Sequence, residues 1–198
     1  MENATKKFSI QIGIIFILNL FFCFQFNTIY GLFWDLIIKL VAIFSNKADA
    51  KVLDRAKNHT IPSVVFSKAQ LNEGFVLEKL QQFQPDLIVL AGFLLKFPES
   101  ILKEYPKVIN IHPALLPKYG GKGMYGMHVH QAVLDNKEIE SGVTIHYVNE
   151  HYDEGEFIFQ KSVNIEDCKT AEEIAHKIHE LEHQYFPTVI SDVLNSKF

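Results

Sequence analysis

Three polar residues in the second half of the chain have side chains that can move protons and stabilise charge. Asn110 and His112 stand in the stretch V-I-N-I-H-P, and Asp153 follows about forty residues later in the stretch Y-D-E-G. An amide can donate a hydrogen bond to a carbonyl oxygen, an imidazole can transfer a proton, and a carboxylate can stabilise the charged imidazole. We expect the three side chains to meet in one cleft, and this combination indicates an enzyme.

The carboxylate should also affect the protonation of the imidazole. A neighbouring negative charge favours the imidazolium form, so Asp153 is expected to raise the pKa of His112. A raised pKa would let His112 act as an acid near neutral pH.

Other histidines are weaker candidates for chemistry. His128 and His130 could bind a metal, but no third ligand stands at a useful spacing, which favours a loop or a helix surface and predicts no metal site. His146 lies within an apolar strand pattern and is expected to be a hydrogen-bonded core residue, with a position lining the cleft as the alternative. Three more histidines are expected on the solvated face of the terminal helix: His176, His179 and His183.

Strand and helix patterns alternate from Val41 onward. Buried strands are expected at 41–44, 63–66, 86–91 and 108–111, and helical segments at 49–57, 72–83 and 100–104. This alternation predicts a Rossmann-like α/β fold with a mostly parallel sheet and helices on both faces. Ligands in such sheets bind beyond the carboxyl ends of the strands, so Asn110 and His112 are in the expected place for a site.

The last third of the chain has a different pattern. Two strands, 142–148 and 156–160, are expected to pair in antiparallel fashion around the turn that contains Asp153. Thr170 and Glu173 have the spacing of a capping box, in which each side chain accepts the backbone N–H of the other residue. Apolar residues at helical spacing then predict a long closing helix.

Length, charge and cysteine content limit the classes of protein. A chain of 198 residues with no internal repeat or linker fits one catalytic domain, here 41–198, behind an atypical segment, 1–40. The net charge of −4 and the lack of a basic stripe argue against a nucleic-acid partner. Cys23 and Cys168 are too few for a metal motif or a disulfide framework, which favours a reduced, cytoplasmic location.

The segment 1–40 is atypical because it is so apolar. No charged side chain occurs from Phe8 to Trp34, and Lys6 and Lys7 precede this run. Hydropathy therefore favours a membrane anchor. A buried strand followed by a helix is the alternative, since Asn19 and Gln25 interrupt the apolar surface.

From about residue 41 to 193, the chain resembles the phosphoribosylglycinamide formyltransferase family. The resemblance rests on N-I-H-P-A-L-L-P-K-Y-G-G, on S-G-V-T-I-H-Y-V and on Y-D-E-G. It is supported by S-N-K-A-D-A at 45–50, by D-L-I-V-L-A-G-F at 86–93 and by G-G-K-G-M-Y-G-M-H-V-H. It implies that a glycinamide amine attacks the formyl carbon of 10-formyltetrahydrofolate, with 5-phosphoribosylglycinamide as acceptor, in purine biosynthesis.

The resemblance also implies roles for particular residues. Asn110 would hold the oxyanion of the tetrahedral intermediate, His112 would be the general acid, and Asp153 would keep His112 protonated and help to move the amine proton. The folate would contact Leu94, Leu95, Lys96, Phe97, Asn149, Glu150, His151 and Tyr152, together with Asn110 and Asp153. The acceptor would contact His179, Glu180, Leu181 and Glu182.

The chain departs from the family pattern at its amino end. Family members begin with a strand and a G-x-G-x-N loop whose backbone N–H groups hold the substrate phosphate. The stretch here is I-G-I-I-F-I-L-N-L-F-F-C-F-Q-F-N, which has no such loop. A membrane-anchored variant is one hypothesis, and an altered reading frame upstream of about Leu40 is the other. Translating the upstream DNA in the two other frames distinguishes them, because only the second predicts a G-x-G-x-N loop there.

Three alternatives are consistent with the same Asn110, His112 and Asp153 motif. Methionyl-tRNA formyltransferase carries a further RNA-binding domain after its catalytic domain, whereas this chain ends after the closing helix. Formyltetrahydrofolate deformylase delivers water with the same trio but has a regulatory domain in front. The third alternative is a catalytically impaired remnant without the phosphate loop.

Overall fold

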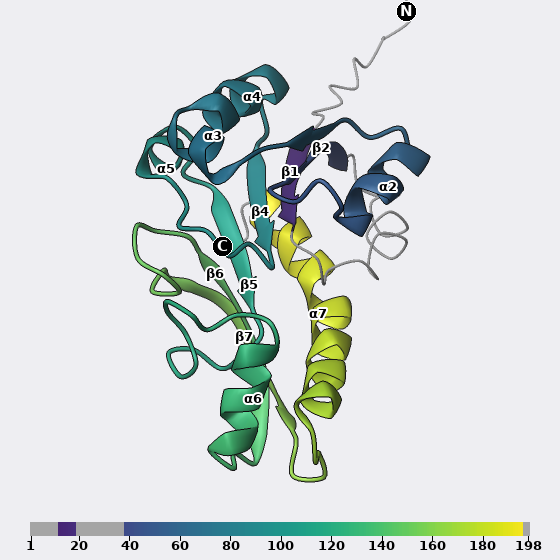
Figure 1. The fold of residues 1–198 in the computed structure, drawn as a ribbon, viewed down its shortest axis with the longest axis vertical. Helices are drawn as coiled ribbons and strands as arrows, with labels where there is room; N and C mark the ends of the chain where they lie inside the picture. Colours follow the sequence, from purple (N-terminus) through teal and green to yellow (C-terminus); the bar gives the residue numbers. More distant parts are fainter. Residues whose placement is uncertain (1–11, 19–37, 196–198) are drawn as a thin grey trace, which may run out of the picture.

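A seven-stranded sheet forms the centre of the part of the chain that this computed structural model describes, residues 12–18 and 38–195 (Figure 1). Its strands are β1 (Ile12–Leu18), β2 (Ile38–Ser45), β3 (Ser63–Val65), β4 (Leu87–Ala91), β5 (Val108–His112), β6 (Glu140–Tyr147) and β7 (Phe157–Asn164), in the order β3-β2-β1-β4-β5-β6-β7. The first five strands in this order pair in parallel, whereas β6 pairs in antiparallel fashion with both β5 and β7. The predicted mostly parallel sheet with antiparallel strands near the carboxyl end is confirmed.

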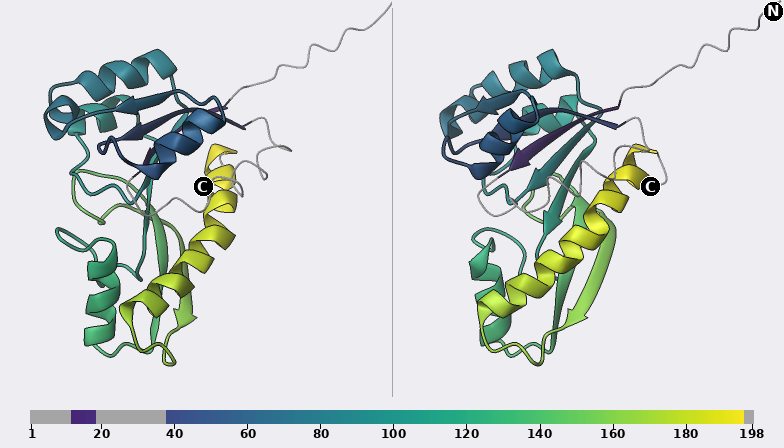
Figure 2. Two further views of the ribbon diagram at one scale, coloured as in Figure 1. Left: turned by 45° about the vertical axis from the view of Figure 1, so that its right-hand side comes forward. Right: turned by 90° about the vertical axis from the view of Figure 1, so that its right-hand side faces the viewer.

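Helices cover both faces of the sheet because successive residues of a buried strand point to opposite sides. In β4, Leu87 and Val89 pack in a core with α2 (Lys51–Asn58) and the end of α7 (Ala171–Leu194). Ile88 and Leu90 pack on the opposite face with α3 (Lys68–Asn72), α4 (Phe75–Phe83) and α5 (Glu99–Glu104). Figure 2 shows these two helical layers from the side. The two-sided burial accounts for the continuous apolar sequence of β4.

Two helices differ from the sequence-based expectation. The helix expected at 72–83 begins only at Phe75, and a separate helix, α3, precedes it. Gly74 separates the two with a φ of 95°, a left-handed conformation that a glycine adopts without the penalty of a side chain. Helix α6 (Met127–Asp135) was not predicted as a helix, and it follows another glycine with positive φ, Gly126.

The closing helix α7 begins as predicted. Thr170 Oγ1 accepts the Glu173 backbone N–H at 3.2 Å, and the Glu173 carboxylate accepts the Thr170 backbone N–H at 3.2 Å. This reciprocal pair is the capping box that the sequence predicted. Helix α7 then runs along one face of the sheet, next to α6 at its beginning (Figure 2).

Strand β1 lies inside the apolar amino-terminal run. It pairs with β2 on one side and β4 on the other, in the middle of the sheet. The strand of the predicted strand-and-helix pair is therefore present, whereas the rest of the run, residues 19–37, and residues 1–11 lie outside the described residues. The interpretations of 1–40 as an anchor or an altered reading frame stay predictions. Among the described residues, no helix has the length and apolar composition of a membrane span.

Candidate active site

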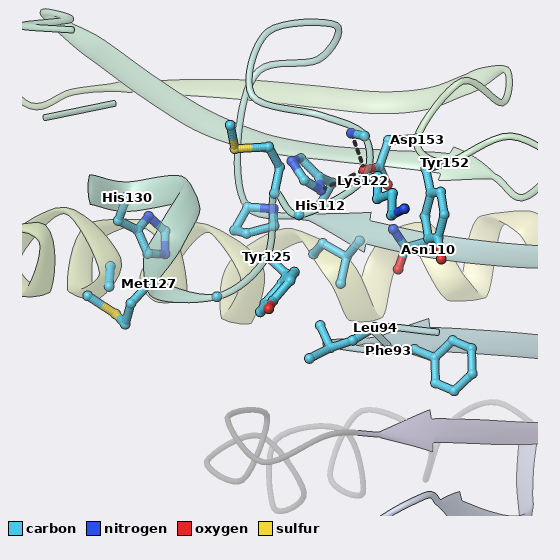
Figure 3. A pocket seen from close by; sticks show the side chains of 18 of the residues that line it. Phe93, Leu94, Asn110, His112, Lys122, Tyr125, Met127, His130, Tyr152 and Asp153 are labelled. Atoms are coloured by element: carbon cyan, nitrogen blue, oxygen red, sulfur yellow. Dashed lines mark hydrogen bonds and ion pairs between the residues drawn. The ribbon is translucent and has the colours of Figure 1, made fainter. Parts of the chain in front are cut away.

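A cleft of about 400 Å³ opens at the carboxyl ends of β4 and β5. This is the place predicted for a ligand in an open α/β sheet, next to the point where the strand order reverses around β1. Figure 3 shows the side chains that line it. They come from the segment after β4, from the end of β5, from the glycine-containing loop 121–127, from the turn before β7 and from α7.

The predicted trio is assembled in this cleft. His112 is 3% exposed, and its Nδ1 lies 3.6 Å from Oδ2 of Asp153. Its Nε2 donates a hydrogen bond to the backbone carbonyl of Tyr119 at 2.7 Å. Oδ2 of Asp153 accepts the backbone N–H of Gly121 at 2.9 Å. Asn110, from the same strand as His112, lines the cleft beside them (Figure 3).

His146 links Asn110 to Asp153, a role that sequence reasoning did not assign to it. Its Nδ1 donates to the carbonyl of Tyr147 at 2.8 Å, so its Nε2 is free to accept from the Asn110 amide nitrogen, 3.1 Å away. The same Nε2 lies 3.6 Å from Oδ1 of Asp153. Asn110 and His146 are direct partners across β5 and β6, and this strand register fixes which way the carboxamide of Asn110 points. The interpretation of His146 as a buried, hydrogen-bonded residue is confirmed, and its side chain lies at a smaller cavity next to the cleft.

A second, smaller cavity of about 50 Å³ adjoins the first. It contains most of the segments predicted to bind the folate: Leu95, Lys96, Phe97, Asn149, Glu150, His151, Tyr152 and Asp153. Leu94 lines the larger cleft instead. Four residues line both cavities: Phe93, Asn110, Tyr152 and Asp153. The two cavities therefore meet at two members of the trio.

The prediction that His112 has a raised pKa is wrong for the structure as it stands. Burial lowers the pKa of His112, because transfer out of water disfavours the charged imidazolium. Asp153 acts in the predicted direction and raises this pKa, as does the carbonyl of Tyr119, but burial outweighs both contributions. Without a further negative charge, His112 is mainly neutral at neutral pH.

Asp153, in contrast, is held in its charged form. Burial raises its pKa, but its interactions with the side chains of His146 and His112 and with the N–H of Gly121 together lower it below its ordinary value. The backbone of Asp153 has a φ of 58°, which is uncommon for a residue with a side chain and marks a locally constrained conformation.

Gly155 allows the turn of Asp153 to lie against β6. A Cβ added at Gly155 would lie 1.7 Å from the backbone carbonyl oxygen of Tyr147, and backbone cannot yield as a flexible side chain can. We expect Gly155→Ala to destabilise the fold by about 2 kcal/mol, the usual cost of overpacking, in urea unfolding. Exposed Glu154→Ala is the matched control, with a change below about 0.5 kcal/mol. Equal stability of the two variants would contradict this role.

The predicted acceptor segment lies only partly in the cleft. His179 and Glu182 line it from α7, whereas Leu181 packs in a hydrophobic core and Glu180 faces solvent. Burial raises the pKa of Glu182 to about 8, and Nε2 of His179 lies 3.9 Å from its Oε2. A carboxyl group so placed is neutral at neutral pH and can donate a hydrogen bond as well as accept one.

The other histidines are divided between cleft and surface. His130 on α6 is buried at the cleft, against the predicted loop or helix surface, and burial lowers its pKa to about 4. It is inaccessible because α6 packs on α7, an arrangement that the residue spacing does not reveal. His128 is exposed on the same helix, as predicted. The described residues contain no group of three or more histidines, cysteines or carboxylates placed to hold a metal ion.

The raised pKa of Glu182 predicts how stability depends on pH. Above pH 4.5 an unfolded chain releases this proton, while the folded chain retains it up to about pH 8. The free energy of unfolding should therefore fall between pH 4.5 and pH 8 and level off above, by at most about 5 kcal/mol from this group. Glu182→Gln, neutral throughout, should remove that fall in urea unfolding at pH 5, 6.5 and 8. Glu180→Gln, at an exposed carboxylate two residues away, should keep it.

Comparison with known proteins adds three findings. The family model described as "formyl transferase" matches residues 34–190. The phosphoribosylglycinamide formyltransferase of Bacillus subtilis is 36% identical over 81% of this chain and 82% of its own length. The solved structure of the phosphoribosylglycinamide formyltransferase of Coxiella burnetii superposes with a TM-score of 0.81 and 32% identity, covering 93% of this chain and 88% of that one.

Two plant relatives match with similar sequence identity, but the match covers a smaller share of their length. The chloroplastic phosphoribosylglycinamide formyltransferase of Arabidopsis thaliana is 36% identical over 80% of this chain, which spans 56% of that protein. For the Vigna unguiculata relative the share is 50%. The chain thus spans about half the length of these two curated relatives.

Proposed function

The chain belongs to the formyl transferase family, and from its site we propose that it transfers the formyl group of 10-formyltetrahydrofolate to the amine of 5-phosphoribosylglycinamide. This reaction is a step of purine biosynthesis. The observation that carries the proposal is the meeting of two cavities at Asn110 and Asp153. A transfer between two substrates needs the donor and the acceptor side by side, with catalytic groups where they meet.

The smaller cavity suits the donor. Phe93, Leu95 and Phe97 give it apolar walls, and the segment 148–153 adds polar residues. A flat heteroaromatic ring such as the pterin of a folate can bind between apolar walls with its polar edge on backbone groups. The formyl group carried on N10 would then lie at the shared residues.

The larger cleft suits the acceptor. A neutral Glu182 can both accept and donate hydrogen bonds to the hydroxyl groups of a ribose, and His179 lines the same wall. The phosphate would lie toward the carboxyl end of β1, where a family member would have its glycine-rich loop. The residues after Leu18 lie outside the described residues, so retention of this phosphate contact stays a prediction to be tested through the KM of the acceptor.

Asn110 and His112 would stabilise the charge that develops when the amine attacks. The new C–N bond turns the formyl oxygen into an oxyanion, which an N–H of Asn110 would stabilise from a position fixed by His146. His112 would become the proton donor to this centre at that moment, because a nearby negative charge raises the pKa of an imidazole. Because burial lowers its pKa, the His112 imidazole would stay neutral until the oxyanion forms.

Asp153 would relay a proton from the attacking amine toward N10 of the folate. The attacking amine loses one proton, and N10 of the folate gains one when the C–N10 bond breaks, so the reaction balances without any further reactant. Asp153 is charged, lies 3.6 Å from His112 and lines both cavities. It can take the amine proton and stabilise the imidazolium form of His112, directly or through water.

The test is an assay of purified protein with both substrates, beside an assay with the donor alone. Tetrahydrofolate formed only with the acceptor present supports the proposal. Formate released at the same rate without acceptor would indicate a deformylase-like activity. Folate binding without either product would indicate the catalytically impaired remnant.

The remaining partner predictions follow from this function. We propose small-molecule substrates, without nucleic acid as partner, and the cytoplasm as the place of action. A membrane association is expected only if segment 1–40 is a true anchor. Fractionation of cells that express the full chain tests this, since an anchor would place the activity in the membrane fraction.

A further inference from the structure

One short segment of the loop after β5 contacts both members of the acid and carboxylate pair. The carbonyl of Tyr119 accepts from Nε2 of His112 at 2.7 Å, and the N–H of Gly121 donates to Oδ2 of Asp153 at 2.9 Å. Between them, Gly120 lies so close to its neighbours that an added Cβ would be 2.5 Å from Leu116 and 3.3 Å from Cβ of Asp153. The position of this segment therefore sets how His112 and Asp153 face one another.

The backbone of Tyr119 needs support to hold this position. Its φ is 58°, a left-handed conformation that costs a residue with a side chain about 1 kcal/mol or more. Conformations of this kind persist where surrounding contacts determine them. The Tyr119 side chain packs against the hydrophobic cluster that contains Val133 and Val143, and a polar contact lies at its far end.

That contact is with Glu138, in the connection between α6 and β6. The Tyr119 hydroxyl donates to Oε1 of Glu138 at 2.9 Å, and Lys118 Nζ binds the same oxygen at 2.9 Å. Burial and the bond with Glu138 together raise the pKa of Tyr119 to about 12, so the hydroxyl remains a donor throughout the physiological range. None of Lys118, Tyr119 and Glu138 lines either cavity.

We propose that Glu138 and Tyr119 are positioning residues for the transfer: the Glu138 carboxylate holds the Tyr119 side chain, so that the Tyr119 carbonyl is fixed against Nε2 of His112. The inference rests on the proposed function, because it concerns the same reaction. It implies that the transfer also depends on Glu138, which lies outside both cavities and 26 positions after His112 in the sequence.

The proposed contact has a consequence for the proton of His112. With Nε2 donating to Tyr119, the other ring nitrogen, Nδ1, faces Asp153 and is the one that can exchange a proton there. The Tyr119 carbonyl also raises the pKa of His112, as Asp153 does, whereas burial and His146 lower it. His130 is the other titratable group that interacts with His112. Loss of the carbonyl contact should thus move the titration of His112 to lower pH.

The experiment compares Tyr119→Phe, Glu138→Ala and Glu138→Gln in the full chain. Tyr119→Phe keeps the ring and removes only the hydroxyl, while Glu138→Gln keeps an oxygen that can accept from it. Tyr119→Phe and Glu138→Ala should each lower kcat about tenfold, with the KM values for both substrates within about twofold. Glu138→Gln should retain most of the activity, and combining Tyr119→Phe with Glu138→Ala should cost no more than either alone.

A surface ion pair far from the site provides the matched control. Glu99 and Lys103 on α5 form an exposed bridge at 2.9 Å, so Glu99→Gln should leave kcat unchanged. The midpoint of the His112 titration, followed by ¹⁵N NMR, is the readout that a purely structural role would not move. It should fall in Tyr119→Phe and Glu138→Ala and stay at the wild-type value in Glu138→Gln.

Each result decides the proposal. Wild-type kcat and an unchanged His112 midpoint in Tyr119→Phe would overturn it, as would a loss of activity that only follows a lowered melting temperature with the midpoint unchanged. If the wild-type protein transfers no formyl group, the proposed function fails, but the NMR titration still shows whether Glu138 acts on His112 through Tyr119.

Discussion

Replacing Asp153 with Asn is expected to lower kcat for formyl transfer about a thousandfold, within the range typical of lost general acid–base catalysis. The amide has nearly the shape of the carboxylate and keeps an oxygen that can accept the Gly121 N–H, so the turn should fold as before. It has no charge, however, and cannot take the amine proton or stabilise the imidazolium form of His112. Measurement of kcat with both substrates saturating tests this directly.

The same variant should change the pH dependence in a defined direction. Asp153 raises the pKa of His112, so its replacement leaves burial less opposed and lowers that pKa further. The limb of the kcat profile that reports the titration of His112 should shift to lower pH. Glu154→Gln, one residue away, exposed and outside both cavities, is the control and should reproduce the wild-type profile. A profile of Asp153→Asn with wild-type midpoints would remove Asp153 from the proton path.

The alternation of strands and helices predicted most of the fold because both faces of the sheet are buried. The apolar run of β4 and the capping box of α7 are local signals, and each corresponds to the element that the structure shows. Helix α6 was missed because its nine residues carry two histidines and a weak apolar pattern directly after a glycine-rich stretch. The break at Gly74 was missed because a single glycine in a helical pattern does not by itself reveal its φ.

Residue types predicted the trio, but not the interactions that control it. Asn110, His112 and Asp153 could be selected from their chemistry and from the position of a strand end. The pairing of Asn110 with His146 depends on strand register, and the lowered pKa of His112 depends on how much water the fold removes from it. Both are properties of the assembled structure, and they change the mechanism. In the proposed mechanism, His112 starts neutral and becomes the acid only as negative charge develops.

That mechanism makes Asn110 the residue on which stabilisation of the oxyanion depends. Asn110→Asp is expected to lower kcat by about two to three orders of magnitude, the usual loss when a donor to an oxyanion is removed. The replacement preserves size, but it substitutes a negative oxygen for the N–H donor that faces Nε2 of His146. The KM for the folate should change much less than kcat, because the donor group interacts most strongly with a charge that exists only in the transition state.

A second asparagine allows the charge change to be controlled. Asn164 uses its side-chain oxygen to accept the Glu166 N–H on the surface, a role that an aspartate performs equally well, so Asn164→Asp should keep wild-type kcat. If Asn110→Asp retained kcat within about threefold while Asp153→Asn lost it, the oxyanion would have to be stabilised by another group. The neutral His112 would be the remaining candidate, since it is the other hydrogen-bonding side chain from β5 that lines the larger cleft. A loss in both variants, with folate KM preserved, would instead support a developing charge beside Asn110 and a proton path through Asp153, the two residues of the trio that line both cavities.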